Sequence, residues 1–151
     1  MDLDKSLISK FVKCTERAAY GASLIKGKGN KIKADQFAVD EMRNELNKIN
    51  MKGRIVIGEG EMDDAPMLYI GEKVGIGKNG PNFDIALDPL EGTKITANNE
   101  RNALTVISLG DKNSFLNAPD VYMEKLAIGP NYPKNFLNLG LNPEEYQLIM
   151  L

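Results

Sequence analysis

The sequence predicts an α/β fold in which helices flank a mixed β-sheet, and three observations lead to this expectation. Apolar residues recur at helical spacing near the N-terminus, short apolar and β-branched runs further along are typical of strands, and the two kinds of segment are mixed along the chain. With 151 residues, of which 42% are hydrophobic and 26% charged, the chain can form one domain with a core. We therefore expect helices and strands packed in layers.

Two helices are expected ahead of the first strand. The first covers about residues 4–25, because an apolar stripe recurs there at three- and four-residue steps. The stripe consists of Leu3, Leu7, Phe11, Cys14, Ala18, Ala22 and Ile25. The stretch GKGN at 27–30 ends this helix, and a second helix is predicted over about residues 34–49. Its expected apolar face contains Phe37, Met42, Leu46 and Ile49.

Strands and a third helix are predicted over the rest of the chain. The strands are expected at 54–57, 83–88, 103–109 and 121–128, and the short helix at 93–99. The segment 65–76 fits no single state. Residues 1–133 form the predicted metal- and phosphate-binding domain, which ends at the structure-breaking stretch GPNYP. The remaining residues, 134–151, end in the apolar run QLIML, so we interpret them as a divergent or truncated tail.

Composition excludes several classes of function. The chain contains no histidine, which removes histidine bases, Ser-His-Asp triads and histidine-bound zinc. The single cysteine excludes a disulfide within the chain and fits a reducing compartment. A net charge of −2 argues against nucleic acid as a partner, and no apolar run approaches a signal peptide or a membrane span. We therefore expect a cytoplasmic protein that uses carboxylates, hydroxyls, lysines or bound water for chemistry.

Acidic side chains gather after two predicted strands and at the start of the second helix. They are Asp35, Glu59, Glu61, Asp63, Asp64, Asp88 and Glu91. Loops at strand ends are where α/β folds usually bind ligands. Two carboxylates about 4 Å apart repel by roughly 4 kcal/mol at an effective dielectric constant near 20, so a group of them needs protons or cations. Oxygen ligands favour Mg²⁺ or Mn²⁺, although each acid alone is more typical of a solvated turn or a helix cap.

The stretch DPLEGT at 88–93 combines groups suited to a metal and a phosphate. Asp88 and Glu91 can bind metal from either side of a tight turn, with the Leu90 carbonyl also exposed to the ions. Gly92 lets a phosphate approach the backbone, and Thr93 begins a helix whose N–H groups favour an anion. The Thr93 hydroxyl can orient a water that attacks the phosphate. This pattern indicates a metal-assisted phosphatase.

DPLEGT resembles the Asp-Pro-(Ile/Leu)-(Asp/Glu)-Gly-Thr signature of the metal-dependent, lithium-sensitive sugar and inositol phosphatases. Two longer blocks, VIGEGEMDDAPMLYIGEKVG and FLNAPDVYMEKLAIGP, are similar to class II fructose-1,6-bisphosphatase, the bacterial form. The resemblance covers about residues 5–133 and corresponds to the N-terminal half of such an enzyme. An inositol-monophosphatase-like activity fits the short signature but not the longer blocks.

The resemblance implies a role for each matching residue. The metal ligands would be Asp35, Glu59, Asp88, Glu91 and the Leu90 carbonyl; the catalytic residues would be Thr93, Asp63 and Lys31; the substrate would contact Gly92, Thr93 and Tyr122. It also implies a layered sugar-phosphatase fold, two or more Mn²⁺ or Mg²⁺ ions, a sugar bisphosphate as the partner, and a homo-oligomer.

The implied activity is hydrolysis of the 1-phosphate of fructose 1,6-bisphosphate to fructose 6-phosphate and phosphate, a phosphoric monoester hydrolysis in gluconeogenesis. Sedoheptulose 1,7-bisphosphate is an alternative substrate, because it presents a similar ketose 1-phosphate end. A second alternative is a catalytically incomplete fragment that binds only metal and phosphate, since the family's residues for the distal phosphate lie in its second half.

Overall fold

The structure, a computed structural model, describes residues 5–58, 67–77, 79–116, 123–131, 138–142 and 145. The chain divides into two compact units, Met1–Ala118 and Pro119–Leu151. The first unit contains α1 (Lys5–Ser23), α2 (Lys31–Leu46), β1 (Lys52–Ile57), β2 (Lys73–Val74), β3 (Asn82–Glu91), α3 (Thr93–Ala97) and β4 (Leu104–Gly110). In the described part of the chain, no helix is long and apolar enough to cross a membrane.

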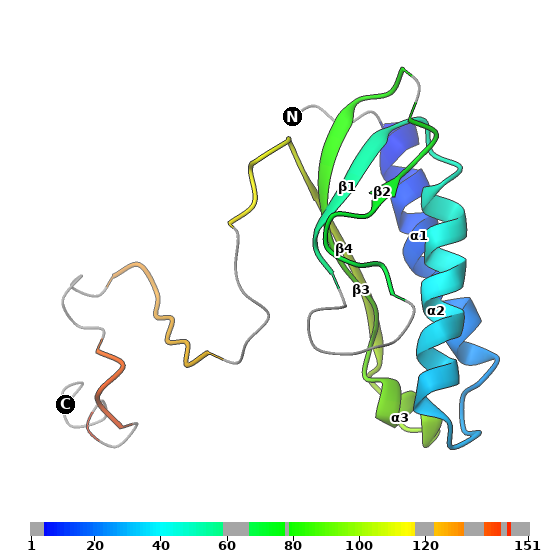
Figure 1. Ribbon diagram of the computed structural model, residues 1–151. Coiled ribbons are helices and arrows are strands. Elements are labelled where there is room, and N and C mark those ends of the chain that lie inside the picture. Colours follow the sequence, from blue (N-terminus) through cyan, green and yellow to red (C-terminus); the bar gives the residue numbers. More distant parts are fainter. Residues whose placement is uncertain are drawn as a thin grey trace. The chain divides into compact units, whose positions relative to one another are not determined.

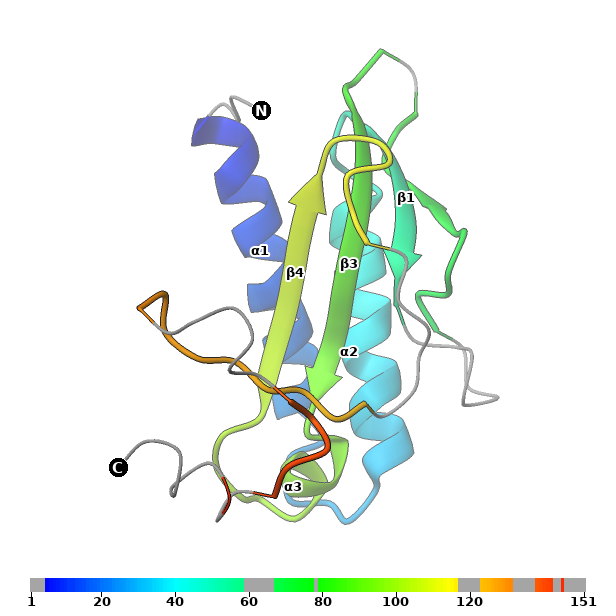
Figure 2. The same cartoon turned by 90° about the vertical axis from the view of Figure 1, so that its left-hand side faces the viewer.

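The strands form one sheet in the order β2-β1-β3-β4. Strands β1 and β3 are parallel, whereas β2 and β4 each run antiparallel to the neighbour that they pair with. Helices α1 and α2 lie side by side against one face of this sheet (Figure 1), and Figure 2 shows β4, β3 and β1 in front of them. This mixed sheet with flanking helices confirms the predicted α/β class.

Helix α1 buries the apolar stripe that predicts it. Phe11, Cys14, Ala18 and Ala22 are all buried in the core, and the ring of Phe11 meets the ring of Phe83 on β3 edge-on, with 6.0 Å between centroids. This contact anchors α1 to the middle of the sheet.

Helix α2 begins earlier than predicted and exposes a residue that was expected in its apolar face. Asn30 caps its first turn, because its side-chain oxygen accepts a hydrogen bond from the Lys33 N–H at 3.0 Å. Phe37 is 38% exposed, so its prediction as part of the buried face was wrong. The two helices approach closely here: a Cβ at Gly21 would lie 2.4 Å from the Phe37 carbonyl oxygen. The small Ala38 therefore faces the core, and the large Phe37 ring lies outside.

Side chains alternate between the two faces of β3, as the pleat of a strand requires. Phe83, Ile85 and Leu87 belong to the core cluster beneath the helices. Asp84 is also buried, and it pairs with Arg54 of β1. The sheet therefore places charged side chains on β3 between the positions that build the core.

The predicted strand at 121–128 does not form over the residues that the structure describes. Residues 123–128 are in neither a helix nor a strand, and residues 121 and 122 lie outside the described residues. Every described residue of this run is exposed. A strand needs a partner to satisfy its N–H and C=O groups, and none of the described strands pairs with this segment. The apolar residues alone were thus an insufficient signal.

Candidate metal and phosphate site

The DPLEGT stretch occupies the end of β3 and contains an interruption of the sheet. The pairing of β3 with β4 shifts register between Asp88 and Glu91. Pro89 lies within this interval and has no N–H to give to the ladder, which is why proline in sheets is confined to edges and bulges. The Leu90 N–H instead donates to the Asp88 side chain at 3.0 Å. The bulge thus lies between Asp88 and Glu91, which themselves stay paired with β4.

Asp88 and Glu91, two of the predicted metal-binding acids, interact at this bulge, and the charge of a third, Asp35, also acts on Asp88. The pKa of Asp88 is raised to about 6, and burial is the largest cause. A hydrogen bond with Glu91 and the negative charges of Glu91 and Asp35 contribute to this rise, while the Leu90 N–H acts in the opposite direction. Asp35 reaches this position from α2, and its Oδ1 atom is buried. The site therefore combines carboxylates from a strand end and a helix.

These groups fit a hard divalent cation, which prefers oxygen ligands and would relieve the repulsion among the acids. The described residues do not by themselves contain three or more acidic, histidine or cysteine side chains grouped closely enough for a full metal cage. Glu59, Asp63 and Tyr122 lie outside the described residues. Asp35, Asp88 and Glu91 can therefore supply only part of the ligand set that the sequence predicts.

The turn from β3 into α3 requires glycine and leaves N–H groups open. Gly92 has φ of 100°, and a Cβ there would lie 2.8 Å from Ile95 Cδ1. Helix α3 starts at Thr93, as predicted, and no side chain caps its first turn. The first N–H groups of a helix have no partner within it, so they can bind an anion beside the acids.

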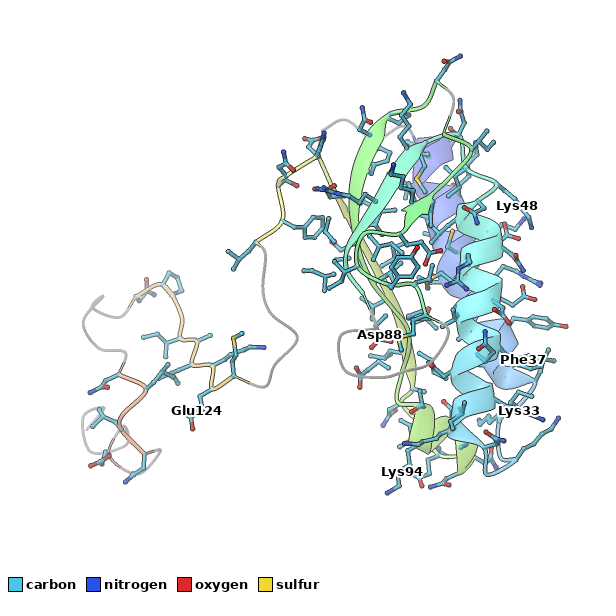
Figure 3. The ribbon with its side chains drawn as sticks, in the orientation of Figure 1. Lys33, Phe37, Lys48, Asp88, Lys94 and Glu124 are labelled. Atoms are coloured by element: carbon cyan, nitrogen blue, oxygen red, sulfur yellow. The ribbon has the colours of Figure 1, made fainter. Side chains whose placement is uncertain are left out.

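The lysine-rich loop before α2 is fixed against α3. The N–H groups of Gly27 and Gly29 donate to the carbonyls of Thr96 and Ala97 at 3.0 and 2.9 Å. This attachment places the exposed start of α2, where Lys31 lies, at the same end of the first unit as α3. Lys33 and Lys94 are also at this end, below Asp88 on β3 (Figure 3). Cations thus lie at the same end of the first unit as α3.

The described residues on either side of positions 59–66 lie close to one another. A Cβ at Gly58 would lie 2.4 Å from the Leu68 carbonyl oxygen, so the two ends pass in close contact. The Gly71 N–H donates to the Ile55 carbonyl at 2.8 Å, which ties the returning segment to β1.

Sequence reasoning missed a positioning pair next to this segment. The Arg43 guanidinium on α2 contacts the Glu72 carboxylate at 2.8 Å and also donates to the Met67 carbonyl. This hydrogen bonding raises the pKa of Arg43. The two side chains are 29 residues apart in the sequence, and no local pattern marks them.

An α/β fold with carboxylates at a strand end beside a helix start fits the class of metal-assisted phosphate hydrolases. Comparison with known families narrows this class. The family described as "Bacterial fructose-1,6-bisphosphatase, glpX-encoded" matches residues 5–148, and the chain belongs to this family.

Curated relatives agree with this assignment. Fructose-1,6-bisphosphatase 1 class 2 of Escherichia coli (strain K12) is 53% identical over 137 residues, which cover 91% of this chain and 40% of the relative. The D-fructose 1,6-bisphosphatase class 2/sedoheptulose 1,7-bisphosphatase of Synechococcus sp. (strain CC9902) is 52% identical over 128 residues, covering 85% and 38%. The protein of that name from Prochlorococcus marinus (strain MIT 9303) is 50% identical over 129 residues, with the same coverage.

The chain therefore spans about two fifths of the length of these relatives, 38–40%. The predicted resemblance to the N-terminal part of class II fructose-1,6-bisphosphatase is confirmed. The boundary at residues 133 and 134 stays a prediction; the family match extends to residue 148, and the two structural units meet after Ala118.

Proposed function

We propose that this chain supplies the metal- and phosphate-binding part of an enzyme that hydrolyses the 1-phosphate of fructose 1,6-bisphosphate. The products would be fructose 6-phosphate and phosphate, as in gluconeogenesis. The observation that supports the proposal is the raised pKa of Asp88 at the end of β3, which burial, the hydrogen bond with Glu91 and the negative charges of Glu91 and Asp35 produce. Membership of the bisphosphatase family supports the choice of substrate.

The proposed metal ligands are Asp35, Glu59, Asp88, Glu91 and the Leu90 carbonyl. Strands β1 and β3 are parallel and in register at Ile57 and Ala86, so both strands lead to the same edge of the sheet. Glu59 follows Ile57 by two residues, and Asp88 follows Ala86 by two residues. Two or more bound Mn²⁺ or Mg²⁺ ions would supply Lewis acidity toward the phosphate and an acidified water.

Each of the remaining predicted residues would contact the phosphate, the attacking water or the sugar. Gly92 and the first N–H groups of α3 receive the phosphate, with Lys31 adding positive charge. The Thr93 hydroxyl orients the attacking water, and Asp63 assists as a nearby acid. Tyr122 contacts the sugar. We also retain the expectations of a homo-oligomer and a cytoplasmic location as proposals.

A second substrate has a specific observation in its favour. Two of the relatives described above carry sedoheptulose 1,7-bisphosphatase activity in their names as well. The reacting end of that sugar is also a ketose 1-phosphate. The proposed metal- and phosphate-binding residues would contact only that end of either sugar. Competition between the two sugars in the assay below would measure the preference.

The test is release of phosphate from fructose 1,6-bisphosphate by the purified chain with Mn²⁺, alongside calorimetric titration of Mn²⁺. We expect Asp88→Ala to abolish both the turnover and the tightest Mn²⁺ binding. Asp111→Ala is the matched control, because Asp111 is an exposed acid in the turn after β4 and should leave both unchanged.

Two results would change the proposal. A cooperatively folded chain that binds Mn²⁺ through Asp88 but releases no phosphate would support the alternative of a metal- and phosphate-binding fragment without catalysis. A chain whose Mn²⁺ binding is insensitive to Asp88→Ala would contradict the metal site itself.

A further inference from the structure

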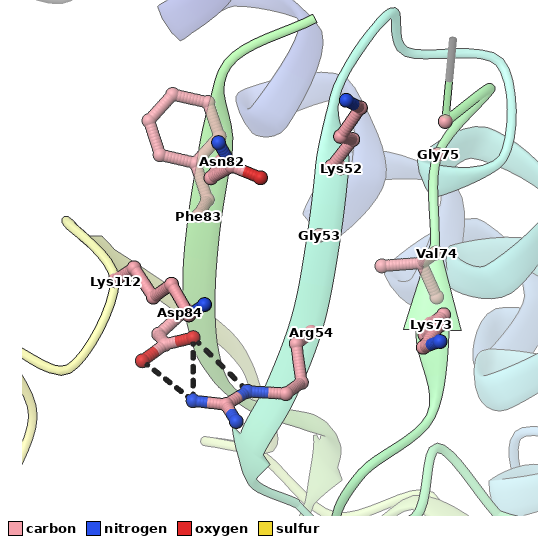
Figure 4. Close-up of a pocket in the computed structure, with 11 residues that line it drawn as sticks. Lys52, Gly53, Arg54, Lys73, Val74, Gly75, Asn82, Phe83, Asp84 and Lys112 are labelled. Carbon is pink, nitrogen blue, oxygen red and sulfur yellow. Dashed lines mark hydrogen bonds and ion pairs between the residues drawn. The ribbon is translucent and has the colours of Figure 1, made fainter.

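A basic pocket lies toward the other end of β3 from the candidate metal site. We use this name for the cavity of about 500 Å³ around Asp84 whose charged lining includes Lys52, Arg54, Lys73 and Lys112 (Figure 4). Its walls come from the starts of β1 and β3, from β2, and from the turn after β4. The sheet register builds this arrangement, because Arg54 pairs with Asp84 on one side and with Lys73 on the other.

Asp84, the one carboxylate in the lining, is already neutralised. The Arg54 Nε and Nη2 atoms donate to its two oxygens at 3.2 and 3.1 Å, and the Asn113 N–H donates to Oδ2 at 2.6 Å. Burial acts to raise the pKa of Asp84, but these hydrogen bonds and the charges of Arg54 and Lys112 lower it overall. Asp84 therefore stays ionised and holds the Arg54 guanidinium in place.

The other three cations have no such partner. Lys52, Lys73 and Lys112 form no salt bridge with any residue that the structure describes, whereas Lys48 contacts Glu45 at 2.7 Å. Once Arg54 and Asp84 cancel, the lining keeps three positive charges around one cavity. Exposed cations around one cavity raise the local concentration of anions there.

We propose that the basic pocket binds a small polyanion, a molecule that carries two or more phosphate groups. The cavity is within the range of small-molecule sites, about 300–1,000 Å³. Lysine ammonium groups bind phosphate as point charges from several directions, and a ligand with several phosphates can engage more than one of them. A fixed Arg54 beside them keeps one wall of the pocket pre-organised.

This pocket is distinct from the candidate metal site. Asp84 and Asp88 are four residues apart on β3, which corresponds to about 13 Å along a strand. The two sites also differ in chemistry: one contains carboxylates that require cations, and the other contains cations that require an anion. Binding at the basic pocket therefore needs no divalent metal, and this separates its test from that of the proposed function.

The test is titration of tripolyphosphate into the full 151-residue chain by calorimetry, with EDTA present to remove divalent metal. We expect binding that weakens as salt increases. The triple variant Lys52→Gln, Lys73→Gln, Lys112→Gln should bind at least about tenfold more weakly, because three exposed ion pairs are lost. The matched control replaces Lys5, Lys10 and Lys125, which are exposed lysines outside the pocket, with glutamine and so has the same net charge.

The control should keep wild-type affinity for tripolyphosphate. Equal losses in both triple variants would show a response to net charge alone and would overturn the proposal, as would no binding by the wild-type chain. A polyglutamate peptide of similar charge serves as the competing probe. If the peptide bound the pocket more tightly than tripolyphosphate, the pocket would be a contact site for an acidic protein segment, and the small-molecule proposal would be wrong.

Discussion

Asp84 and Asp88 are the same residue type on the same strand, yet their surroundings give them opposite properties. The Arg54 guanidinium and the Asn113 N–H lower the pKa of Asp84 in spite of its burial. Burial, Glu91 and Asp35 raise the pKa of Asp88 to about 6. One end of β3 thus holds a satisfied acid and the other end an acid that lacks positive charge. A carboxylate at a strand end is informative about function only when its partners are known.

The comparison also separates a structural role from a ligand-binding role. Breaking the contacts of Asp84 should lower the free energy of unfolding, because the Arg54 guanidinium and the Asn113 N–H would lose their hydrogen-bond acceptor. Removing the charge of Asp88 should increase the stability of the metal-free protein, because repulsion among the acids falls. It should decrease the stability of the metal-bound protein, because a proposed ligand is lost.

The largest expected effect is stabilisation by metal. At a concentration of Mn²⁺ about 100 times its dissociation constant, the free energy of unfolding of the wild-type chain should rise by about 2.7 kcal/mol. Asp88→Asn should lose most of this gain, and Asp111→Asn should keep it. Urea denaturation with and without Mn²⁺ measures both. An equal gain in all three proteins would place the metal elsewhere.

The second effect is the loss of the Asp84 contacts. Asp84→Asn should lower the free energy of unfolding by about 2 kcal/mol, because the Arg54 guanidinium keeps only a neutral partner. The value is below that for a fully buried pair, since the Arg54 side chain is 44% exposed. Urea denaturation in EDTA measures this change. Unchanged stability would show that Arg54 and Asn113 find equivalent partners in water.

The third effect is a dependence of the free energy of unfolding on pH. The contribution of Asp88 has the opposite sign to that of Asp84. The pKa of Asp88 rises from an ordinary value of 3.8 to about 6 in the folded chain. Between about pH 4 and pH 6 the folded chain keeps a proton that the unfolded chain has released, so this group lowers stability as pH rises through that window.

In EDTA, Asp88→Asn should therefore match the wild-type chain below about pH 4 and exceed its free energy of unfolding by about 1 kcal/mol above pH 6, allowing for solvent screening of a half-exposed group. The contribution of Asp84 is present above its ordinary pKa and is lost as pH falls below it. Urea denaturation across this range measures both. A stability difference between Asp88→Asn and wild type that stays constant with pH would contradict the raised pKa.

The smallest effect concerns Thr96 in α3. Its Oγ1 atom is buried and has no hydrogen-bond partner among the described residues. Thr96→Val should raise the free energy of unfolding by about 0.5 kcal/mol, because a buried hydroxyl without a partner is replaced by a methyl group. Thr105→Val is the contrasting variant: its hydroxyl donates to the Thr15 carbonyl at 3.0 Å, so it should lose about 1 kcal/mol. Thermal unfolding of the pair would detect the opposite signs, and a loss in both would show that Thr96 has a partner.

The fold was largely predictable because its strongest signals are local. The stripe containing Phe11, Cys14 and Ala18 is a property of one helix, and the structure buries it as expected. Phe37 was placed wrongly because burial in α2 depends on the close approach of Gly21 in another helix. The strand prediction was also wrong over the described residues 123–128, because a strand depends on a partner that a local pattern does not reveal.

The candidate site was likewise predictable only where its signals are local in the sequence. The carboxylates and the glycine turn of DPLEGT were visible in the sequence, and in the structure Asp88 interacts with Glu91 and is affected by the charge of Asp35. The role of Asp84 was not visible, because its partner Arg54 is 30 residues away on the neighbouring strand. The bulge around Pro89 and the raised pKa of Asp88 likewise depend on the three-dimensional environment.

The most direct test of this account is a pH titration of the two aspartate carboxyl carbons by NMR, with and without Mg²⁺. We predict that metal-free Asp88 titrates near pH 6 and Asp84 below its ordinary value of 3.8. Mg²⁺ should lower the apparent pKa of Asp88 and leave that of Asp84 unchanged, because only Asp88 belongs to the proposed metal site. An Asp88 that titrates near pH 4 and does not respond to Mg²⁺ would contradict the account.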